Sequence, residues 1–212
     1  MTRHVVLEGS SFDRFAGACA LVVGVGALAY AGVFAVIVAA EPPTWVAGLW
    51  FFLLMVGGLV SVPVMVALYH RLRPTDAGFA MLAMLLGLTG AVGSAVHGAY
   101  DLANVIRPVL GAPPSELPNP IDPRGLLTFG FVALALIIVS WLIIRGGRLP
   151  RGLGTLGYLS GALLLVIYLG RLIAFDPRNP ILLVSALLAG LVVNPAWWIW
   201  LGRSLLRSTP RP

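Results

Sequence analysis

The chain has 212 residues, of which 59% are hydrophobic and 10% are charged, and its mean hydropathy is +0.96. Soluble domains are about one-quarter charged, so this composition excludes a water-soluble globule and predicts one membrane domain. The net charge of +6 does not indicate a nucleic-acid partner, because the basic residues lie at the ends of apolar runs. All 14 basic residues are arginine, which excludes chemistry through a lysine Schiff base.

Six apolar runs are long enough to cross a hydrocarbon core of ~30 Å at a helical rise of ~1.5 Å per residue. The runs are continuously apolar and lack strict alternation, which favours helices over barrel strands. We therefore predict an all-α, polytopic transmembrane bundle of six helices that forms a single domain. The predicted helices are Phe15–Ala39, Trp45–Tyr69, Phe79–Ile106, Leu126–Ile144, Leu153–Phe175 and Ile181–Leu201.

The arginines between these runs predict the orientation. Cytoplasmic loops carry an excess of basic residues, so the arginine-rich side is expected to be cytoplasmic, with both termini on it. The opposite side has Arg107, Arg124 and Arg178, with Arg171 near its boundary. The composition, rich in arginine and free of lysine, favours a bacterial source, and the expected location is the plasma (inner) membrane. The cytoplasmic side receives ten arginines: Arg3, Arg14, Arg71, Arg73, Arg145, Arg148, Arg151, Arg203, Arg207 and Arg211.

Tryptophan and proline residues add detail to this topology. Tryptophan favours membrane interfaces, so Trp45 and Trp50 are expected near the outer interface. The longest loop, 107–125, contains six prolines and predicts a stiff external strap. Pro63 and the Asn194–Pro195 pair are expected to bend the second and sixth helices. The inner interface is expected to hold Trp141, Trp197, Trp198 and Trp200.

Two predicted helices carry a stripe of small and polar residues at spacings of three or four, which places each stripe on one helix face. Small residues allow close helix packing, so we expect the glycine-rich halves of the third and fifth helices to contact each other. The outer halves would then separate around a polar cluster, with an ion pair between Asp101 and Arg171. The stripes are Gly90, Ser94, His97, Asp101 and Asn104 on the third helix, and Gly154, Gly157, Gly161, Tyr168 and Arg171 on the fifth.

Two interpretations of this cluster stay open. In one, the cluster is an outward-facing pocket in which His97 titrates near neutrality and Arg171 receives an anionic group. In the other, it is only a clamp between helices. The candidate ligand-binding residues are His97, Asp101, Asn104, Tyr168 and Arg171.

Cofactor chemistry has little support in the sequence. The chain has three histidines and one cysteine, too few for a metal site of three or four ligands, so no metal is predicted. Paired axial histidines for haem are excluded, because His70 and His97 belong to opposite ends of their helices. A single axial ligand to a haem or chlorophyll-type pigment stays open at His97, since Gly90 and Gly93 leave room for a ring.

The functional prediction rests on the absence of catalytic motifs. No Gly-x-Ser-x-Gly elbow and no phosphate-binding loop occurs. The leading hypothesis is a non-enzymatic accessory or small-ligand-binding bundle, whose partners are membrane lipids and another membrane protein or a second copy. One alternative is a small transporter or channel with an outward vestibule. Another is an intramembrane enzyme acting on lipids, with His97 as base and Asp101 orienting it.

The segment 145–161, with the sequence Arg-Gly-Gly-Arg-Leu-Pro-Arg followed by a glycine-rich helix start, resembles a turn in a family of small bacterial multi-pass proteins of unknown function. The resemblance extends to the Leu-x-Arg-Pro turn at Leu72–Pro74 and to the count of six helices. It implies a topology and no activity. The proline-rich loop and the His97–Asp101 pair depart from the pattern of that family.

Overall fold

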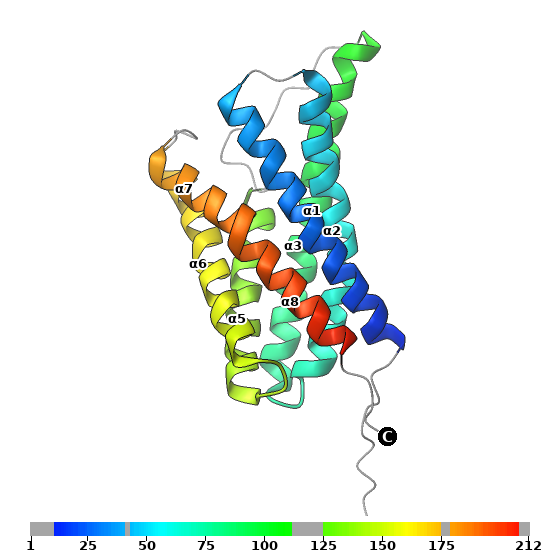
Figure 1. Ribbon diagram of the computed structural model, residues 1–212, viewed down its shortest axis with the longest axis vertical. Coiled ribbons are helices and arrows are strands. Elements are labelled where there is room, and N and C mark those ends of the chain that lie inside the picture. Colours follow the sequence, from blue (N-terminus) through cyan, green and yellow to red (C-terminus); the bar gives the residue numbers. More distant parts are fainter. Residues whose placement is uncertain (1–10, 41–42, 112–124, 175–178, 208–212) are drawn as a thin grey trace, which may run out of the picture.

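The computed structural model describes residues 11–40, 43–111, 125–174 and 179–207, and these residues contain helices and no strands (Figure 1). The first three helices are single α-helices, whereas the fourth and sixth spans include π-helical turns. The elements are α1 Ser11–Ala39, α2 Thr44–Leu72, α3 Ala77–Ile106, the short 3₁₀ helix η1 Arg107–Leu110, the π-helix η2 Leu126–Phe131, α5 Val132–Gly146, α6 Arg151–Ala174, α7 Pro180–Leu188, the π-helix η3 Ala189–Val193 and α8 Asn194–Leu206.

These elements form six spans, as the apolar runs predicted. Each span has 21 to 30 residues and is apolar enough to cross a membrane. Large apolar side chains such as Val25, Leu59 and Val96 lie on the outside of the bundle, where lipid would replace the protein neighbours that a soluble fold supplies. The all-α, six-helix transmembrane architecture is confirmed.

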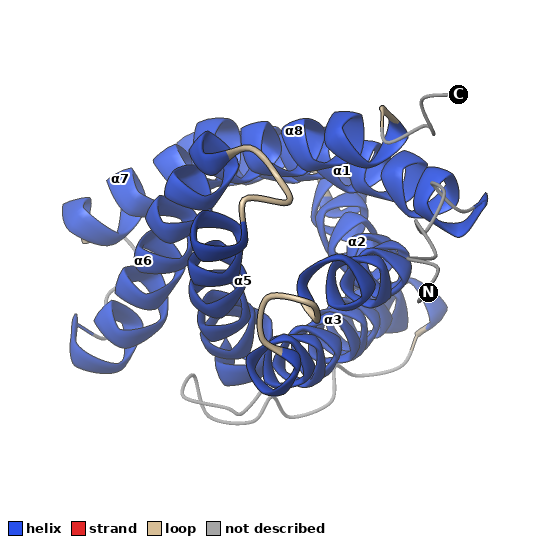
Figure 2. Cartoon of the chain, turned by 90° about the horizontal axis from the view of Figure 1, so that it is seen from below, coloured by secondary structure: helices blue, strands red, loops and turns tan. Residues whose placement is uncertain are grey.

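The spans are arranged as a ring in chain order (Figure 2). Each span packs against the next, and the last span returns to the first through contacts between α8 and α1. Gly17 near the start of α1 lies against Leu206 and Gly202 near the end of α8, so the first and last helices meet at one end of the ring. We call this end, where Arg71, Arg145 and Arg203 also lie, the basic end.

Short polar contacts fix the helix ends. The Asp76 side chain accepts a hydrogen bond from the Phe79 amide at 3.1 Å and begins α3. Gly147 adopts a left-handed φ of 62°, which ends α5 and reverses the chain toward α6. At the basic end, the Arg71 guanidinium contacts the Asp13 carboxylate at 2.8 Å and joins the end of α2 to the start of α1.

Proline affects the two expected bends differently. Helix α2 runs without interruption from Thr44 to Leu72 with Pro63 inside it. In the sixth span, the π-helix η3 comes immediately before Asn194 and Pro195. Because Pro195 has no amide hydrogen, it breaks the regular i to i−4 ladder, and the backbone accommodates the missing bond by widening the preceding turn.

The packing expected between the two glycine stripes is wrong. Gly154, Gly157 and Gly161 of α6 lie against Ile144, Ser140 and Ile137 of α5. Gly90 of α3 lies against Val132 and Leu127, on the other side of the same span. The η2–α5 span therefore stands between the two helices, because its own small buried residues accept a close approach on both faces.

Two further expectations concern the interface and the external loop. Trp197 is fully buried in the core rather than at the inner interface, and Trp198 is only 9% exposed. Trp141 and Trp200 are at least partly exposed near the basic end. Most of the predicted strap lies outside the described residues, which resume at Gly125 after Gly111.

Candidate functional site

The ring encloses a cavity of about 350 Å³ in the half opposite the basic end, which we call the upper chamber. Four polar side chains reach it from three different spans: His97 and Asp101 from α3, Arg171 from α6 and Asn194 from the start of α8. The remaining lining is apolar or aromatic, and comes mainly from α1, α2 and the α7–η3 segment. A low-dielectric chamber with both acidic and basic groups is unusual in a membrane span, where each charge is costly.

His97 stands at the centre of a three-residue hydrogen-bonded chain. Its Nε2 lies 3.1 Å from Oδ2 of Asp101, one helical turn further along α3. Its Nδ1 lies 3.0 Å from Oγ1 of Thr128, in the π-helix η2. The Thr128 hydroxyl can donate to a neutral ring or accept from a protonated one, so the chain holds the imidazole in place in either state.

Arg171 reaches the chamber from near the end of α6. Its Cζ is 6.0 Å from the centroid of the Phe129 ring, at the outer limit of a cation–π contact. The side chain is exposed as well as lining the chamber, so the guanidinium occupies the chamber's edge. An anionic group entering there would meet a positive charge first.

Aromatic rings form the wall contributed by α1 and α2. Trp50 stacks against Tyr30 with ring centroids 5.2 Å apart and against Phe34 with centroids 5.6 Å apart. Phe51 follows at 5.0 Å from Trp50. These contacts join the halves of α1 and α2 that lie away from the basic end, and they give the chamber a rigid apolar face.

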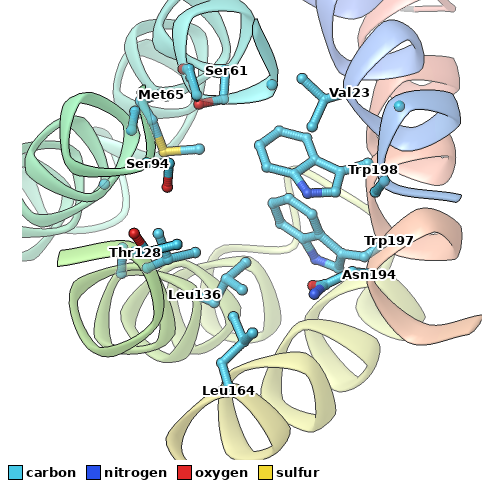
Figure 3. Close-up of a pocket in the computed structure, with 18 of the residues that line it drawn as sticks. Val23, Ser61, Met65, Ser94, Thr128, Leu136, Leu164, Asn194, Trp197 and Trp198 are labelled. Atoms are coloured by element: carbon cyan, nitrogen blue, oxygen red, sulfur yellow. Dashed lines mark hydrogen bonds between the residues drawn. The ribbon is translucent and has the colours of Figure 1, made fainter. Parts of the chain in front are cut away.

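A second cavity of about 180 Å³, the lower chamber, continues through the middle of the bundle toward the basic end and reaches Leu68, Gly87 and Val139. The two chambers share Ala27, Tyr30, Leu54, Phe129, Leu164 and Asn194. Figure 3 shows the Ser94 and Thr128 hydroxyls on one side of the lower chamber and the indole rings of Trp197 and Trp198 across it. Toward the basic end, fully buried side chains such as Leu142, Leu201 and Ile143 fill the interior.

Both π-helical segments border these chambers. Segment η2 supplies Thr128 and Phe129, and η3 supplies Ala189 and Gly190 before Asn194. The Ser160 hydroxyl of α6 donates to the Asn194 side chain and holds this turn against the neighbouring span. A π-turn rotates the residues after it relative to a regular helix, and such turns often occur at functional sites.

The structure brings together three of the five candidate residues, since His97, Asp101 and Arg171 line the same chamber. Tyr168 instead packs beside Gly130 and is not among the residues that line the two chambers. Asn104 lies one turn beyond Asp101 on α3, also away from the described linings. The ion pair between Asp101 and Arg171 stays a prediction, and the Asp101 carboxylate contacts His97.

Sequence reasoning missed several residues of the site. Thr128 is one of two hydroxyl residues in an otherwise apolar span, which is the only local signal of its role. Asn194 was interpreted as part of a bend, and its neighbour Pro195 in fact marks the π-turn that places it. Tyr30 and Trp50 gave no signal beyond a preference for interfaces.

The donor set does not resemble a metal site. Within the described ranges, no three side chains of histidine, cysteine, aspartate or glutamate gather closely enough to hold an ion. Both ring nitrogens of His97 contact protein oxygens, so an axial bond to haem or a pigment would have to replace one of these contacts. Comparison with family models, curated proteins and solved structures finds no match to this chain.

Proposed function

We propose that the protein is a non-enzymatic small-ligand-binding bundle of the bacterial plasma membrane, with both termini in the cytoplasm. The ligand would occupy the upper chamber, with an apolar part extending into the lower chamber. The observation that carries the proposal is the enclosure of His97, Asp101 and Arg171 around one cavity rather than in a filled interface. Its natural partners would be membrane lipids, with another membrane protein or a second copy completing an accessory role.

The filled basic end favours binding over conduction. A transporter or channel needs a polar route through the membrane, whereas the interior beyond the lower chamber is occupied by Leu142, Leu201 and Leu205, each at most 1% exposed. Membrane proteins line conduction routes with polar groups or water-filled cavities. A transporter is the alternative, and it would require the basic end to rearrange so that a polar route opens through it.

Native mass spectrometry of the protein released from its own membranes tests the proposal. A small molecule bound in the chambers should appear as a discrete added mass on the wild-type protein. Ala27 lines both chambers, so Ala27→Leu should fill their junction and remove that mass. Ala29→Leu is the matched control, because Ala29 is exposed on the same helix and the substitution adds the same volume outside both chambers.

Two outcomes would contradict ligand binding in the chambers. One is an added mass that survives Ala27→Leu unchanged, which would place the molecule elsewhere. The other is a wild-type protein that carries no added mass when native lipids are retained. Solute uptake by vesicles that contain the purified protein would instead support the transporter.

A second candidate, an intramembrane enzyme acting on lipids, is favoured by one specific contact. Thr128 completes a chain of hydroxyl, imidazole and carboxylate with His97 and Asp101. In such a chain the imidazole takes the hydroxyl proton while the carboxylate orients the ring, which makes the hydroxyl oxygen nucleophilic.

A fluorophosphonate probe tests this second candidate. Attack would form a bond between Thr128 Oγ1 and phosphorus, release fluoride and transfer the hydroxyl proton to His97 Nδ1. Labelling that maps to Thr128, persists in Thr128→Ser and disappears in Thr128→Val and His97→Gln would support an enzyme. Absence of label on the folded wild-type protein would leave ligand binding as the function.

A further inference from the structure

A third recess lies at the basic end and shares no lining residue with either chamber. It has a volume of about 690 Å³ and lies between the turn that joins α5 to α6 and the last turns of α8. We call it the basic groove. Its lining consists of Arg148, Leu149, Pro150, Ala196, Ile199, Trp200, Arg203, Ser204 and Arg207.

The charged part of the basic groove comes from two elements. Arg203 and Arg207 are four residues apart and therefore share a face of α8. Arg148 follows Gly147, whose left-handed backbone turns the chain back across the helix ends. All three arginine side chains are exposed, and the nine lining residues include no acidic group. Guanidinium groups present forked donors that match phosphate oxygens.

The rest of the basic groove is apolar and lies deeper in the span. Ala196 and Ile199 precede Arg203 on α8 by one to two turns, so they lie within the membrane when the arginines are at its surface. Trp200 is 40% exposed between these levels, and its ring tip packs against Gly152 of α6. A tryptophan in this position is typical of the lipid headgroup region.

We propose that the basic groove binds an anionic phospholipid. The phosphate would contact Arg148, Arg203 and Arg207, and an acyl chain would lie along Trp200, Ile199 and Ala196. Charge complementarity identifies the headgroup, and the apolar continuation of the same recess identifies a lipid rather than a free ion. Basic recesses between transmembrane helices on the cytoplasmic side recognise anionic headgroups in this way.

This site is independent of the ligand proposed for the chambers, because the two linings share no residue. Filling the chambers with Ala27→Leu should therefore leave lipid binding in the basic groove unchanged. Conversely, loss of the groove arginines should leave any mass bound in the chambers unchanged.

Native mass spectrometry with added lipid tests the proposal. The protein is titrated with phosphatidylglycerol and, separately, with phosphatidylcholine of the same acyl chains. We expect tighter binding of phosphatidylglycerol, reduced about 10- to 30-fold in the double variant Arg148→Gln/Arg203→Gln. The matched control is Arg14→Gln/Arg73→Gln, which removes the same charge at the same end, outside the groove. This control should bind phosphatidylglycerol nearly as the wild type does.

Three results would overturn the proposal. Equal affinity for the two lipids would show that headgroup charge is not recognised. Equal losses in the two double variants would show that only the general positive charge of this end matters. Displacement of phosphatidylglycerol by inorganic phosphate at comparable concentration would identify a free-ion site. The lipid comparison uses wild-type protein, so it decides the question even when a variant fails to fold.

Discussion

The two halves of the ring have similar apolar sequences but differ in how tightly their interiors are packed. Near the basic end the interior is filled, and Leu142, Ile143 and Leu201 have no exposed surface. In the opposite half the same six spans surround a chamber of about 350 Å³, and its lining includes His97, Asp101 and Arg171. The difference suggests that stability resides mainly in the filled half, which leaves the hollow half free to carry function.

Backbone geometry accounts for part of this difference. Glycines of α6 bring it close to α5 near the basic end, where Gly154 approaches the Ser140 carbonyl. Further along, each of the two spans with a π-turn departs from regular helix geometry beside the chambers. Close packing and hollow space are therefore built by adjacent segments of the same spans.

Equivalent leucine truncations in the two halves should give the largest contrast. Leu142 is fully buried, so Leu142→Ala leaves a new cavity and should lower the unfolding free energy by ~2–5 kcal/mol. Leu54 already borders both chambers, so Leu54→Ala enlarges an existing space and should cost less. Thermal unfolding of the two detergent-solubilised variants measures the difference. Equal losses would contradict a filled half and a hollow half.

Two neighbouring glycines of α2, Gly57 and Gly58, both line the lower chamber but differ in the space beside them. A methyl group on Gly58 would lie 2.5 Å from the Ala91 carbonyl oxygen and 2.7 Å from the Ala95 amide, both backbone atoms of α3. A methyl group on Gly57 would meet nothing within 4 Å. Gly58→Ala should therefore destabilise the protein by ~1–3 kcal/mol, as overpacking does.

Gly57→Ala is the control for this prediction and should unfold at nearly the wild-type temperature. The comparison is informative because both substitutions add one methyl group at adjacent positions of one helix. If Gly57→Ala were as damaging as Gly58→Ala, helix bending rather than close contact with α3 would be the cause.

The sequence predicted the six spans because run length and apolarity suffice to identify a membrane helix. It did not predict their neighbours, because a glycine stripe shows that a close contact exists without showing which helix makes it. Gly90 approaches Val132 and Gly157 approaches Ser140, both in the η2–α5 span, and these two residues look like ordinary members of an apolar run.

The polar stripes of α3 and α6 predicted His97, Asp101 and Arg171, whereas the residues that reach the chambers from other spans were missed. His97 and Asp101 are four residues apart, so helical periodicity alone places them together. Thr128 is 31 residues from His97, and its position depends on a π-turn that no simple period reveals. Asn194 depends on a second π-turn, for which Pro195 was the available signal.

Loss of the Thr128 hydroxyl should have a smaller effect than either packing change. Thr128→Val keeps the shape of the side chain but removes the partner of His97 Nδ1, so a loss of ~1 kcal/mol is expected. Thr128→Ser should retain most of that stability. Thr89→Val is the control, because the exposed Thr89 hydroxyl bonds only to the Leu85 carbonyl of its own helix among the contacts described. If Thr128→Val left the unfolding free energy unchanged, His97 would have another partner, such as water in the chamber.

The smallest effect is expected at the surface of the basic end. Arg71 and Asp13 form an ion pair of 2.8 Å, with 24% and 13% of their side chains exposed. Partial exposure screens the pair, so Arg71→Gln should cost ~0–1 kcal/mol. The double variant Asp13→Asn/Arg71→Gln should cost less than the sum of the two single changes, because the shared ion pair is lost only once. Thermal unfolding at low and high salt separates this electrostatic loss from packing, since added salt should reduce it. A loss as large as that of Leu142→Ala would show that the ion pair, rather than the buried leucines, holds the filled half together.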